Sequence, residues 1–330
     1  MGLALISAAT SEAIATAAQA LREGALVAFP TETVYGLGAD ARNPAALRRL
    51  YATKGRPDTH PVIVHVATAS ALLHWANTVP AFAQVLTDAF WPGPLTLILP
   101  RAEGVSDLLT GGQDSIGVRV PAHPIAQALL TRFVALGGEG IAAPSANRFG
   151  RVSATTAAHV ADEFGSEVAM VLDGGPCDHG IESTIVDCTR GEPAVLRPGA
   201  ISIEQLARVL GRTPRIADAA PRASGTLASH YAPRTSSRLL HRGALLDALA
   251  HLGRPGSHIA VLAHSITQPP DFEGTWFDAP IDSAEYAHQL YANLRALDAH
   301  QADEIWIETP PDGPDWTAVN DRLRRATFRN

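Results

Sequence analysis

The residues best suited to chemistry in this sequence begin with Lys54, the only lysine among 26 basic residues. It stands two positions before Arg56 in the segment KGRPDTHP, residues 54–61, which two prolines stiffen. A compact ammonium and a forked guanidinium together suit the phosphates of a nucleoside triphosphate. A solvated basic turn is the alternative that these residues alone leave open. We expect both cations to line a cleft as exposed side chains, whose loss would cost little stability.

Hydroxyl and glycine residues follow a predicted buried strand at Leu26–Pro30. The segment 31–38 reads TETVYGLG. The hydroxyls of Thr31 and Thr33, together with backbone N–H groups at the glycines, could bind a small polar ligand. A tight turn with a cap is the alternative. Because no G-x-x-x-x-G-K-[ST] motif occurs anywhere in the chain, this segment is not a Walker loop.

Two polar residues interrupt apolar strands. Arg119 lies within IGVRV, residues 116–120, and burying a guanidinium without an anion is costly. Asp114 or the carboxylate of a substrate could supply that anion. His65 lies within VIVHV, residues 62–66. Such a histidine is more typical of a satisfied core residue than of a ligand, unless the end of its strand opens onto the cleft.

Three further loops carry hydroxyls and backbone donors. They read APSANRFGRVS (143–153), GIEST (180–184) and LRPG (196–199). Each is a weak signal alone. Loops that follow strands are, however, where ligands usually bind in open α/β folds.

Strands and helices must position these residues, and they alternate irregularly along the chain. Apolar β-branched runs predict strands, and helical spacing of apolar residues predicts helices. The predicted strands are Leu26–Pro30, Val62–Val66, Leu95–Leu99, Ile116–Val120, Val168–Leu172, Ser183–Asp187, Ala194–Arg197, Ile259–Ala263 and Glu304–Glu308. The predicted helices are Asn43–Tyr51, Ile125–Leu136, Ile203–Leu210, Leu245–Leu252 and Ser283–Ala299, after a first strand and an alanine-rich helix. This pattern indicates an α/β fold with a mixed sheet.

A change of composition divides the chain. Residues 213–234 mix alanine, proline, serine and arginine without periodicity, which is typical of an interdomain linker. The roughly 95 residues that follow are enough to fold as a unit of their own. We therefore predict a domain over 1–212, a linker over 213–234 and a second α/β domain over 235–330.

Composition argues against several classes of protein. The net charge of −7 does not suit a protein whose whole surface binds nucleic acid. Cys177 and Cys188 are the only cysteines, which argues against a disulfide scaffold or a cysteine zinc site. Cys177 could be a reactive thiol, although an incidental loop cysteine is favoured. No apolar run reaches the roughly 18 residues that cross a bilayer. We expect a cytoplasmic protein with no membrane contact.

Taken in order, the motifs resemble those of the YrdC-like threonylcarbamoyladenylate synthase family, in its longer form with an appended C-terminal domain. The matching segments are FPTETVYGLGADA (29–41), KGRPDTHPVIVH (54–65), WPGPLTLIL (91–99), IGVRVPAHP (116–124), APSANRFGRVS (143–153), GGPCDHGIESTIVD (174–187) and VLRPG (195–199). HYAP (230–233) matches the longer form. These segments span most of residues 1–212, and their conjunction is specific.

The resemblance implies a twisted mixed sheet with helices around a basic cleft, followed by a smaller Rossmann-like α/β domain. The linker 213–234 would close over the active site. The residues implied for L-threonine are Thr33, His65, Arg119, Ala143 and Ser183. Those implied for ATP are Lys54, Arg56, His60, Ser115, Ser145, Asn147, Ser153, Arg197 and Tyr231. Lys54 and Arg56 would act in catalysis as triphosphate contacts, with no dedicated acid or base and no protein side chain assigned to a metal.

The implied reaction joins L-threonine, bicarbonate or CO2, and ATP into threonylcarbamoyl-AMP, and it releases pyrophosphate. Mg2+ would accompany ATP. The product would serve the threonylcarbamoyladenosine modification of tRNA through a downstream tRNA threonylcarbamoyl transferase, with transient contact to tRNA.

Two departures and two rival functions remain open. Residues 223–226 read ASGT where the family often has SPGM, and Val152 and Ala154 stand where prolines are common. A double-stranded-RNA-binding module without catalysis is one rival, against which the net charge of −7 counts. A carbamoyl-transfer enzyme of the hydrogenase-maturation type is the other. Such proteins carry cysteine-rich zinc modules, for which this chain has no room.

Overall fold

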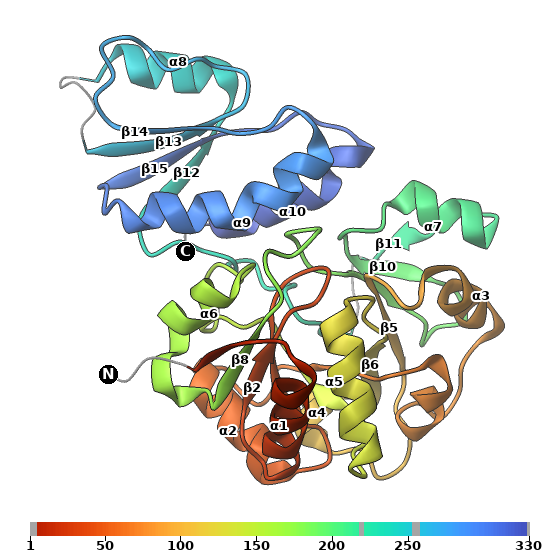
Figure 1. The fold of residues 1–330 in the computed structure, drawn as a ribbon. Coiled ribbons are helices and arrows are strands. Elements are labelled where there is room, and N and C mark those ends of the chain that lie inside the picture. Colours follow the sequence, from red (N-terminus) through yellow and green to blue (C-terminus); the bar gives the residue numbers. More distant parts are fainter. Residues whose placement is uncertain (1–4, 218–220, 253–257, 329–330) are drawn as a thin grey trace. The chain divides into compact units, whose positions relative to one another are not determined.

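The structure is a computed structural model that describes residues 5–217, 221–252 and 258–328. The chain divides into two compact units (Figure 1). The first consists of residues 1–149 and 153–226, and the second of residues 150–152 and 227–330. Residues 218–220 of the predicted linker lie outside the described residues.

The first unit is built on an eleven-stranded sheet in the order β1-β8-β2-β3-β7-β4-β6-β5-β9-β10-β11. Parallel pairs, such as β4 with β6, occur beside antiparallel pairs, such as β2 with β3, so the predicted mixed sheet is confirmed. The strands are β1 (Ile6–Ala8), β2 (Val27–Phe29), β3 (Gly36–Asp40), β4 (Ile63–His65), β5 (Leu95–Pro100), β6 (Ser115–Arg119), β7 (Ile141–Ala142), β8 (Met170–Asp173), β9 (Thr184–Asp187), β10 (Ala194–Arg197) and β11 (Arg215–Ile216).

Helices cover both faces of this sheet. They are α1 (Ser11–Arg22), α2 (Pro44–Lys54), α3 (Ala81–Phe90), α4 (Asp107–Thr110), α5 (Pro124–Ala135), α6 (Ala157–Phe164) and α7 (Ile203–Leu210), with short 3-10 turns at Ala69–His74 and Gly165–Glu167. The alternation along β2 separates two cores. Val27 and Phe29 pack with α1 and α5, while Leu26 and Ala28 belong to the larger cluster on the other face. Figure 1 shows α1 and α5 side by side.

One local prediction differs from the structure. The sequence indicates a loop over 31–38, whereas the chain turns at Thr31–Tyr35 and then returns as β3, antiparallel to β2. A Cβ atom at Gly38 would lie 2.9 Å from both Phe29 and Ile141 side-chain atoms. This glycine therefore serves close packing between strands rather than ligand binding.

The second unit has a four-stranded sheet in the order β12-β15-β13-β14, and all of its pairs are parallel. The strands are β12 (Ser236–Leu240), β13 (Ile259–Ala263), β14 (Thr275–Asp278) and β15 (Glu304–Glu308). The helices are α8 (Arg242–Ala250), α9 (Ser283–Ala299) and α10 (Thr317–Ala326), with a 3-10 turn at Pro314–Trp316. In Figure 1, α8 covers one face of this sheet, and α9 and α10 cover the other. The predicted smaller α/β unit is confirmed.

Candidate active site

The turn between β2 and β3 places the hydroxyls of Thr31 and Thr33 within hydrogen-bonding distance of each other. The Thr31 hydroxyl donates to the carbonyl of Val34 at 2.7 Å, and it lies 2.8 Å from the Thr33 hydroxyl. A hydroxyl has a single proton, and a carbonyl can only accept. The Thr33 hydroxyl must therefore donate to Thr31, which leaves it only acceptor capacity toward other groups.

Arg119, the last residue of β6, is buried and held on three sides. Its Nε donates to the carbonyl of Gly93 at 3.1 Å, and its Nη1 donates to the Thr33 hydroxyl at 2.9 Å. Its Nη2 lies 2.6 Å from a carboxylate oxygen of Glu32. The anion that the sequence leads us to expect beside Arg119 is therefore Glu32. Asp114, the alternative protein carboxylate, is 99% exposed and pairs with Arg101.

The electrostatics of this ion pair favour the charged carboxylate. Burial acts to raise the pKa of Glu32, but the charge and proximity of Arg119 and the backbone N–H groups of Glu32 and Ala122 outweigh it. The pKa of Glu32 is lowered as a result. The pair is ionised at neutral pH, and so the Arg119 guanidinium is neutralised within the protein.

His65 and Ala143 lie beside this pair. His65 ends β4 directly opposite Arg119 on β6, and its ring meets the edge of Phe29 at a centroid distance of 6.3 Å. Burial, together with the charge of Arg119, lowers the pKa of His65 to about 3, so the ring is neutral. Ala143 is buried and donates its N–H to the carbonyl of Ile63. His65 lies at the end of its strand. The sequence allows it to bind a ligand only in such a position.

Ser183 precedes β9 and contacts a second buried arginine. Its hydroxyl lies 2.8 Å from that of Thr96 and accepts a bond from Arg197 Nη2 at 3.1 Å. Arg197 also donates to the Ser183 carbonyl, and its Nη1 donates to the carbonyl of Ser224 at 2.9 Å. Arg197 thus joins Ser183, which is predicted to bind threonine, to residue Ser224 of the predicted linker.

Lys54 ends α2 and is buried, with only 2% of its surface exposed. Its Nζ donates to the carbonyl of Ser145 at 2.7 Å and to that of Asn147. Burial, and then the charge of Arg56, hold the pKa of Lys54 well below its usual value. Lys54 therefore fixes the loop that contains Ser145 and Asn147. The prediction that Lys54 lines the cleft as an exposed side chain was wrong, because its ammonium is buried where it donates to these two carbonyls.

Arg56 follows through the left-handed Gly55 and is also buried, at 8% exposure. Its Nη2 donates to the carbonyl of Pro61 at 2.7 Å and to the Ser224 hydroxyl at 3.3 Å. The ring of His60 meets Phe149 at 5.2 Å. Burial, then the charges of Arg56 and Arg222, lower the pKa of His60. The charge of Arg56 thus acts on both Lys54 and His60, two other residues predicted to bind ATP.

Ser115 begins β6 and lines a small cavity together with residues of the 222–224 segment. Ala223 packs there on an apolar floor of Ile63, Ile98 and Ile185. Ser153 lies apart from this cavity and donates its hydroxyl to Glu182 at 2.6 Å. Ser224 therefore links Arg56 to Arg197, while Ser153 has a carboxylate partner of its own.

Tyr231 belongs to the second unit, and the structure places it among buried groups there. It has a left-handed backbone with φ of 61° and is 1% exposed. Its ring stacks on Tyr291 at 5.5 Å, and the Arg322 guanidinium lies 5.2 Å from the ring centroid. Its role toward ATP stays a prediction.

The structure thus brings together Thr33, Arg119 and His65, and separately Lys54 with the Ser145–Asn147 loop. Sequence reasoning missed Glu32, Thr96 and Ser224. Glu32 could have been found, since it stands next to Thr33 in the motif while Arg119 required an anion. Nothing in the local sequence marks Thr96 or Ser224.

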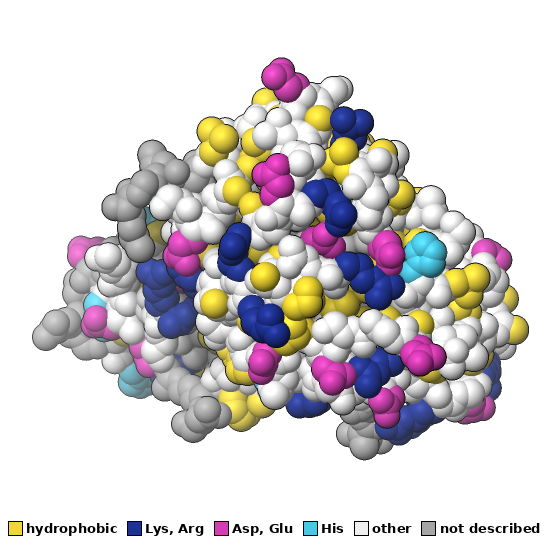
Figure 2. Space-filling model, turned by 90° about the horizontal axis from the view of Figure 1, so that it is seen from below, with side chains coloured by type: hydrophobic (Ala, Val, Ile, Leu, Met, Phe, Trp, Pro, Cys, Tyr) yellow, Lys and Arg dark blue, Asp and Glu magenta, His cyan; other side chains and the backbone are white. Residues whose placement is uncertain are grey.

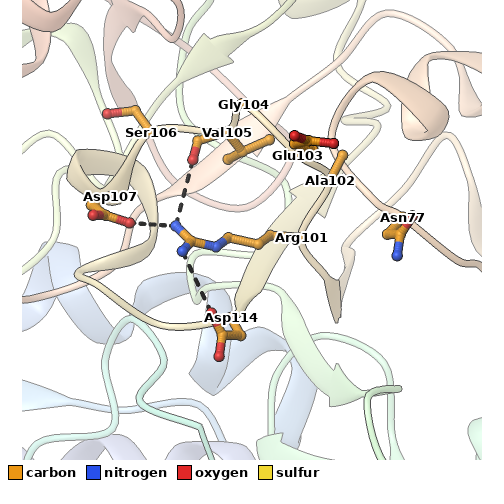
Figure 3. Close-up of a pocket in the computed structure, with 9 residues that line it drawn as sticks. All are labelled: Asn77, Arg101, Ala102, Glu103, Gly104, Val105, Ser106, Asp107 and Asp114. Atoms are coloured by element: carbon orange, nitrogen blue, oxygen red, sulfur yellow. Dashed lines mark hydrogen bonds and ion pairs between the residues drawn. The ribbon is translucent and has the colours of Figure 1, made fainter.

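A different pocket lies at the end of β5 (Figure 3). None of the residues predicted to bind ligands lines it. Its arginine, Arg101, is already engaged by Asp107, by Asp114 at 3.4 Å and by the Val105 carbonyl. Because its only cation is taken by carboxylates, this pocket does not suit a phosphate or a carboxylate ligand.

Among residues 5–217, 221–252 and 258–328 there is no group of three histidine, cysteine or acidic side chains placed to hold a metal ion. In the same residues no helix is both long and apolar enough to cross a membrane.

Two family models match the chain. One, Sua5_yciO_yrdC, described as telomere recombination, matches residues 19–199. The other, described as the C-terminal domain of threonylcarbamoyl-AMP synthase, matches residues 201–327. Threonylcarbamoyl-AMP synthases of Pyrococcus abyssi and Bacillus subtilis are 37% and 38% identical to the chain. Each comparison covers 95% of this chain, and 94% and 92% of those proteins.

Solved structures give a consistent result. The crystal structure of P. abyssi Sua5 complexed with L-threonine has a TM-score of 0.89 at 36% identity, covering 99% of this chain and 97% of that one. A double variant of the same protein, with a histidine and a tyrosine replaced by alanine, also has a TM-score of 0.89, at 35% identity over 99% of this chain and 96% of that one. Escherichia coli YciO, at 24% identity, shares the fold over 62% of this chain and all of its own, with a TM-score of 0.53.

Proposed function

Because this chain belongs to the Sua5/YciO/YrdC family of threonylcarbamoyl-AMP synthases, we propose that it joins L-threonine, bicarbonate or CO2, and ATP into threonylcarbamoyl-AMP and pyrophosphate. The chain is a nucleotidyltransferase-type enzyme. The observation that carries the choice of substrates is that the first unit contains two groups of buried cations with different partners. Arg119 lies at the end of β6 beside the Thr33 hydroxyl and the Glu32 carboxylate, and Lys54 and Arg56 are buried and donate to backbone carbonyls.

The threonine side of the proposed site uses Arg119 for the substrate carboxylate. Arginine presents a planar fork that matches a carboxylate. Thr33 accepts a hydrogen bond from Arg119 and has acceptor capacity left, so it suits an N–H or O–H of the substrate. His65, Ala143 and Ser183 complete the proposed set. Relatives support this assignment, since the P. abyssi Sua5 structure was determined with L-threonine.

In the proposed reaction the threonine ammonium gives one proton to water, and the free amine attacks the carbon of CO2. The nitrogen then gives a second proton to water, which leaves a carbamate anion. A carbamate oxygen then attacks the α-phosphorus of ATP, the bond to the β-phosphate oxygen breaks, and pyrophosphate leaves. Positioning and charge neutralisation dominate such phosphoryl chemistry. Lys54 and Arg56 would stabilise the charge that grows on pyrophosphate. Ser115, Ser145, Asn147, Ser153, His60 and Arg197 are proposed as further ATP contacts.

Mg2+ would enter with ATP and shield its phosphates. Lys54 and Arg56 donate to backbone carbonyls, and among the described residues no group of three histidine, cysteine or acidic side chains is placed to hold a metal ion. Phosphate oxygens and water would then provide most of its coordination. Tyr231 is proposed to contact ATP on the strength of the HYAP motif, and a raised KM for ATP in Tyr231→Leu would support this.

We further propose that the product passes to a tRNA threonylcarbamoyl transferase, with only transient contact to tRNA. The face of the molecule in Figure 2 interleaves Lys and Arg with Asp and Glu, and it has no continuous basic surface. This arrangement does not favour a module that binds double-stranded RNA.

The test is direct. The protein is incubated with ATP, Mg2+, bicarbonate and threonine, and each component is omitted in turn. We expect pyrophosphate and a product with the mass of threonylcarbamoyl-AMP only in the complete mixture. Pyrophosphate release that does not depend on threonine would overturn the proposal.

A further inference from the structure

Glu32 is not among the residues predicted to bind ligands, although it pairs with the buried Arg119. It is 4% exposed, and it stands between two threonines in the turn that follows β2. A carboxylate is costly to bury, and the Arg119 pair only repays that cost if the geometry is good. A surface pair would stabilise the fold with less penalty. The burial of this pair therefore points to a purpose beyond stability.

The hydrogen-bond inventory of Arg119 shows what the pair achieves. A guanidinium has five N–H donors. The single N–H of Nε goes to the Gly93 carbonyl, and one N–H of Nη1 goes to Thr33. Nη2 faces Glu32 at 2.6 Å. At least one N–H on each terminal nitrogen has no hydrogen-bond acceptor among the described residues. A carboxylate can accept one such donor on each of its two oxygens.

Resting on the proposed threonine role of Arg119, we infer that Glu32 is a positioning residue that fixes this guanidinium so that its two remaining donors meet the substrate carboxylate. Three contacts hold the group: the backbone of Gly93, the hydroxyl of Thr33 and the carboxylate of Glu32. The Thr33 contact is itself fixed, because the Thr33 proton is committed to Thr31 and Thr31 donates to a carbonyl. Glu32 supplies the only charged anchor.

Charge compensation and positioning by Glu32 have opposite effects on threonine binding. Glu32 carries the same charge as the substrate carboxylate, and it already neutralises Arg119. If Glu32 only compensated charge, its removal would leave an unopposed cation, and threonine would bind more tightly. If it positions Arg119, its removal frees the guanidinium, and threonine binds more weakly. The two roles therefore predict changes of opposite sign.

The experiment measures threonine binding by calorimetry without ATP, and steady-state KM values for threonine and ATP. The variants are Glu32→Gln, which keeps the shape and removes the charge, and Glu32→Asp, which restores the charge. The matched control is Asp40→Asn. Asp40 is a buried carboxylate of the same unit that pairs with Arg22 at 2.5 Å, and it contacts no residue of the proposed site.

We expect Glu32→Gln to weaken threonine binding about tenfold or more, with the KM for ATP within about twofold of wild type. Glu32→Asp should recover part of the loss. Asp40→Asn should lower the melting temperature without changing the threonine affinity. Tighter or unchanged threonine binding in Glu32→Gln, or an equal rise in both KM values, would overturn the positioning role.

A second ligand separates positioning from direct recognition of the amine. The probe is 3-hydroxybutyrate, which keeps a carboxylate and a hydroxyl but lacks the amino group. A positioning residue acts through Arg119, so Glu32→Gln should weaken threonine and this probe by similar factors. Loss confined to threonine would overturn the inference and assign Glu32 to the ammonium. Should wild type itself fail to bind threonine, the proposed function fails instead.

Discussion

Two buried cations of the first unit, Arg119 and Lys54, have opposite surroundings. Arg119 lies 2.6 Å from the Glu32 carboxylate, whereas Lys54 donates only to the carbonyls of Ser145 and Asn147. Arg56 is close enough to Lys54 to lower its pKa further. The first cation has a carboxylate at ion-pair distance. The second is bound by two carbonyls, and the charges of Arg56 and Glu163 act on its pKa in opposite directions.

This difference shows that buried cations of one domain can recognise ligands in two ways. A neutralised cation can present directed donors, and it selects a ligand by shape. Cations that lie close together raise the local potential, and they select a ligand by charge. We therefore expect threonine recognition to depend on geometry, and recognition of the triphosphate to depend on net positive charge.

The largest effect should come from Lys54→Met, which removes the ammonium group with little change of volume. We expect kcat/KM for ATP to fall by about 100-fold or more, in the range seen when one stabilising donor is lost. Steady-state kinetics with threonine at saturation measure it. Lys54→Arg is the control, and it should retain more activity than Lys54→Met. Equal activity of Lys54→Met and wild type would contradict a role for charge.

Arg119→Met should affect threonine and stability together. The KM for threonine should rise about 10- to 100-fold, while that for ATP changes little. Because Glu32 is left buried and unpaired, the free energy of unfolding should also fall by about 3–5 kcal/mol. Chemical denaturation measures this loss. Adding Glu32→Gln should restore much of the stability but none of the threonine affinity. No restoration in the double variant would show that the pair is not the source of the loss.

Substrate choice should give a smaller effect. A pocket that fits the threonine methyl group loses roughly 1–3 kcal/mol with serine. We expect kcat/KM for serine to be lower than for threonine by about tenfold or more, measured from pyrophosphate release. Equal values for threonine, serine and glycine would contradict a shaped threonine pocket.

The smallest effect concerns His65 and pH. The unfolded chain protonates this histidine near its usual pKa of 6.5, while the folded protein does so only near 3. Between these pH values the unfolded chain binds this proton and the folded protein does not. The free energy of unfolding therefore decreases as pH falls from about 6.5 toward 3. Between pH 6.5 and 5.5 the loss should be about 1 kcal/mol. Denaturation curves of wild type and His65→Gln should diverge in this range, and parallel curves would contradict the shift.

The sequence by itself determined the elements whose signals are local. The helices Ile203–Leu210 and Ser283–Ala299 and the strand Ile259–Ala263 have the predicted bounds, because periodicity and caps act within a few residues. The ordered motifs also identified the family. In the same way, Asn43 and Pro44 gave the start of α2, which the Asn43 side chain caps.

Only the tertiary structure decided which charges meet. Sequence reasoning required an anion for Arg119, but Glu32 reaches it only because the turn after β2 and the end of β6 lie together in the folded sheet. Lys54 was expected to be exposed. It is buried because two carbonyls of a loop distant in sequence accept hydrogen bonds from its Nζ. Gly36–Asp40 became a strand because β2 pairs with its first three residues and β7 with its last two. Pairing between segments far apart in sequence depends on the whole chain's packing, which no local pattern contains.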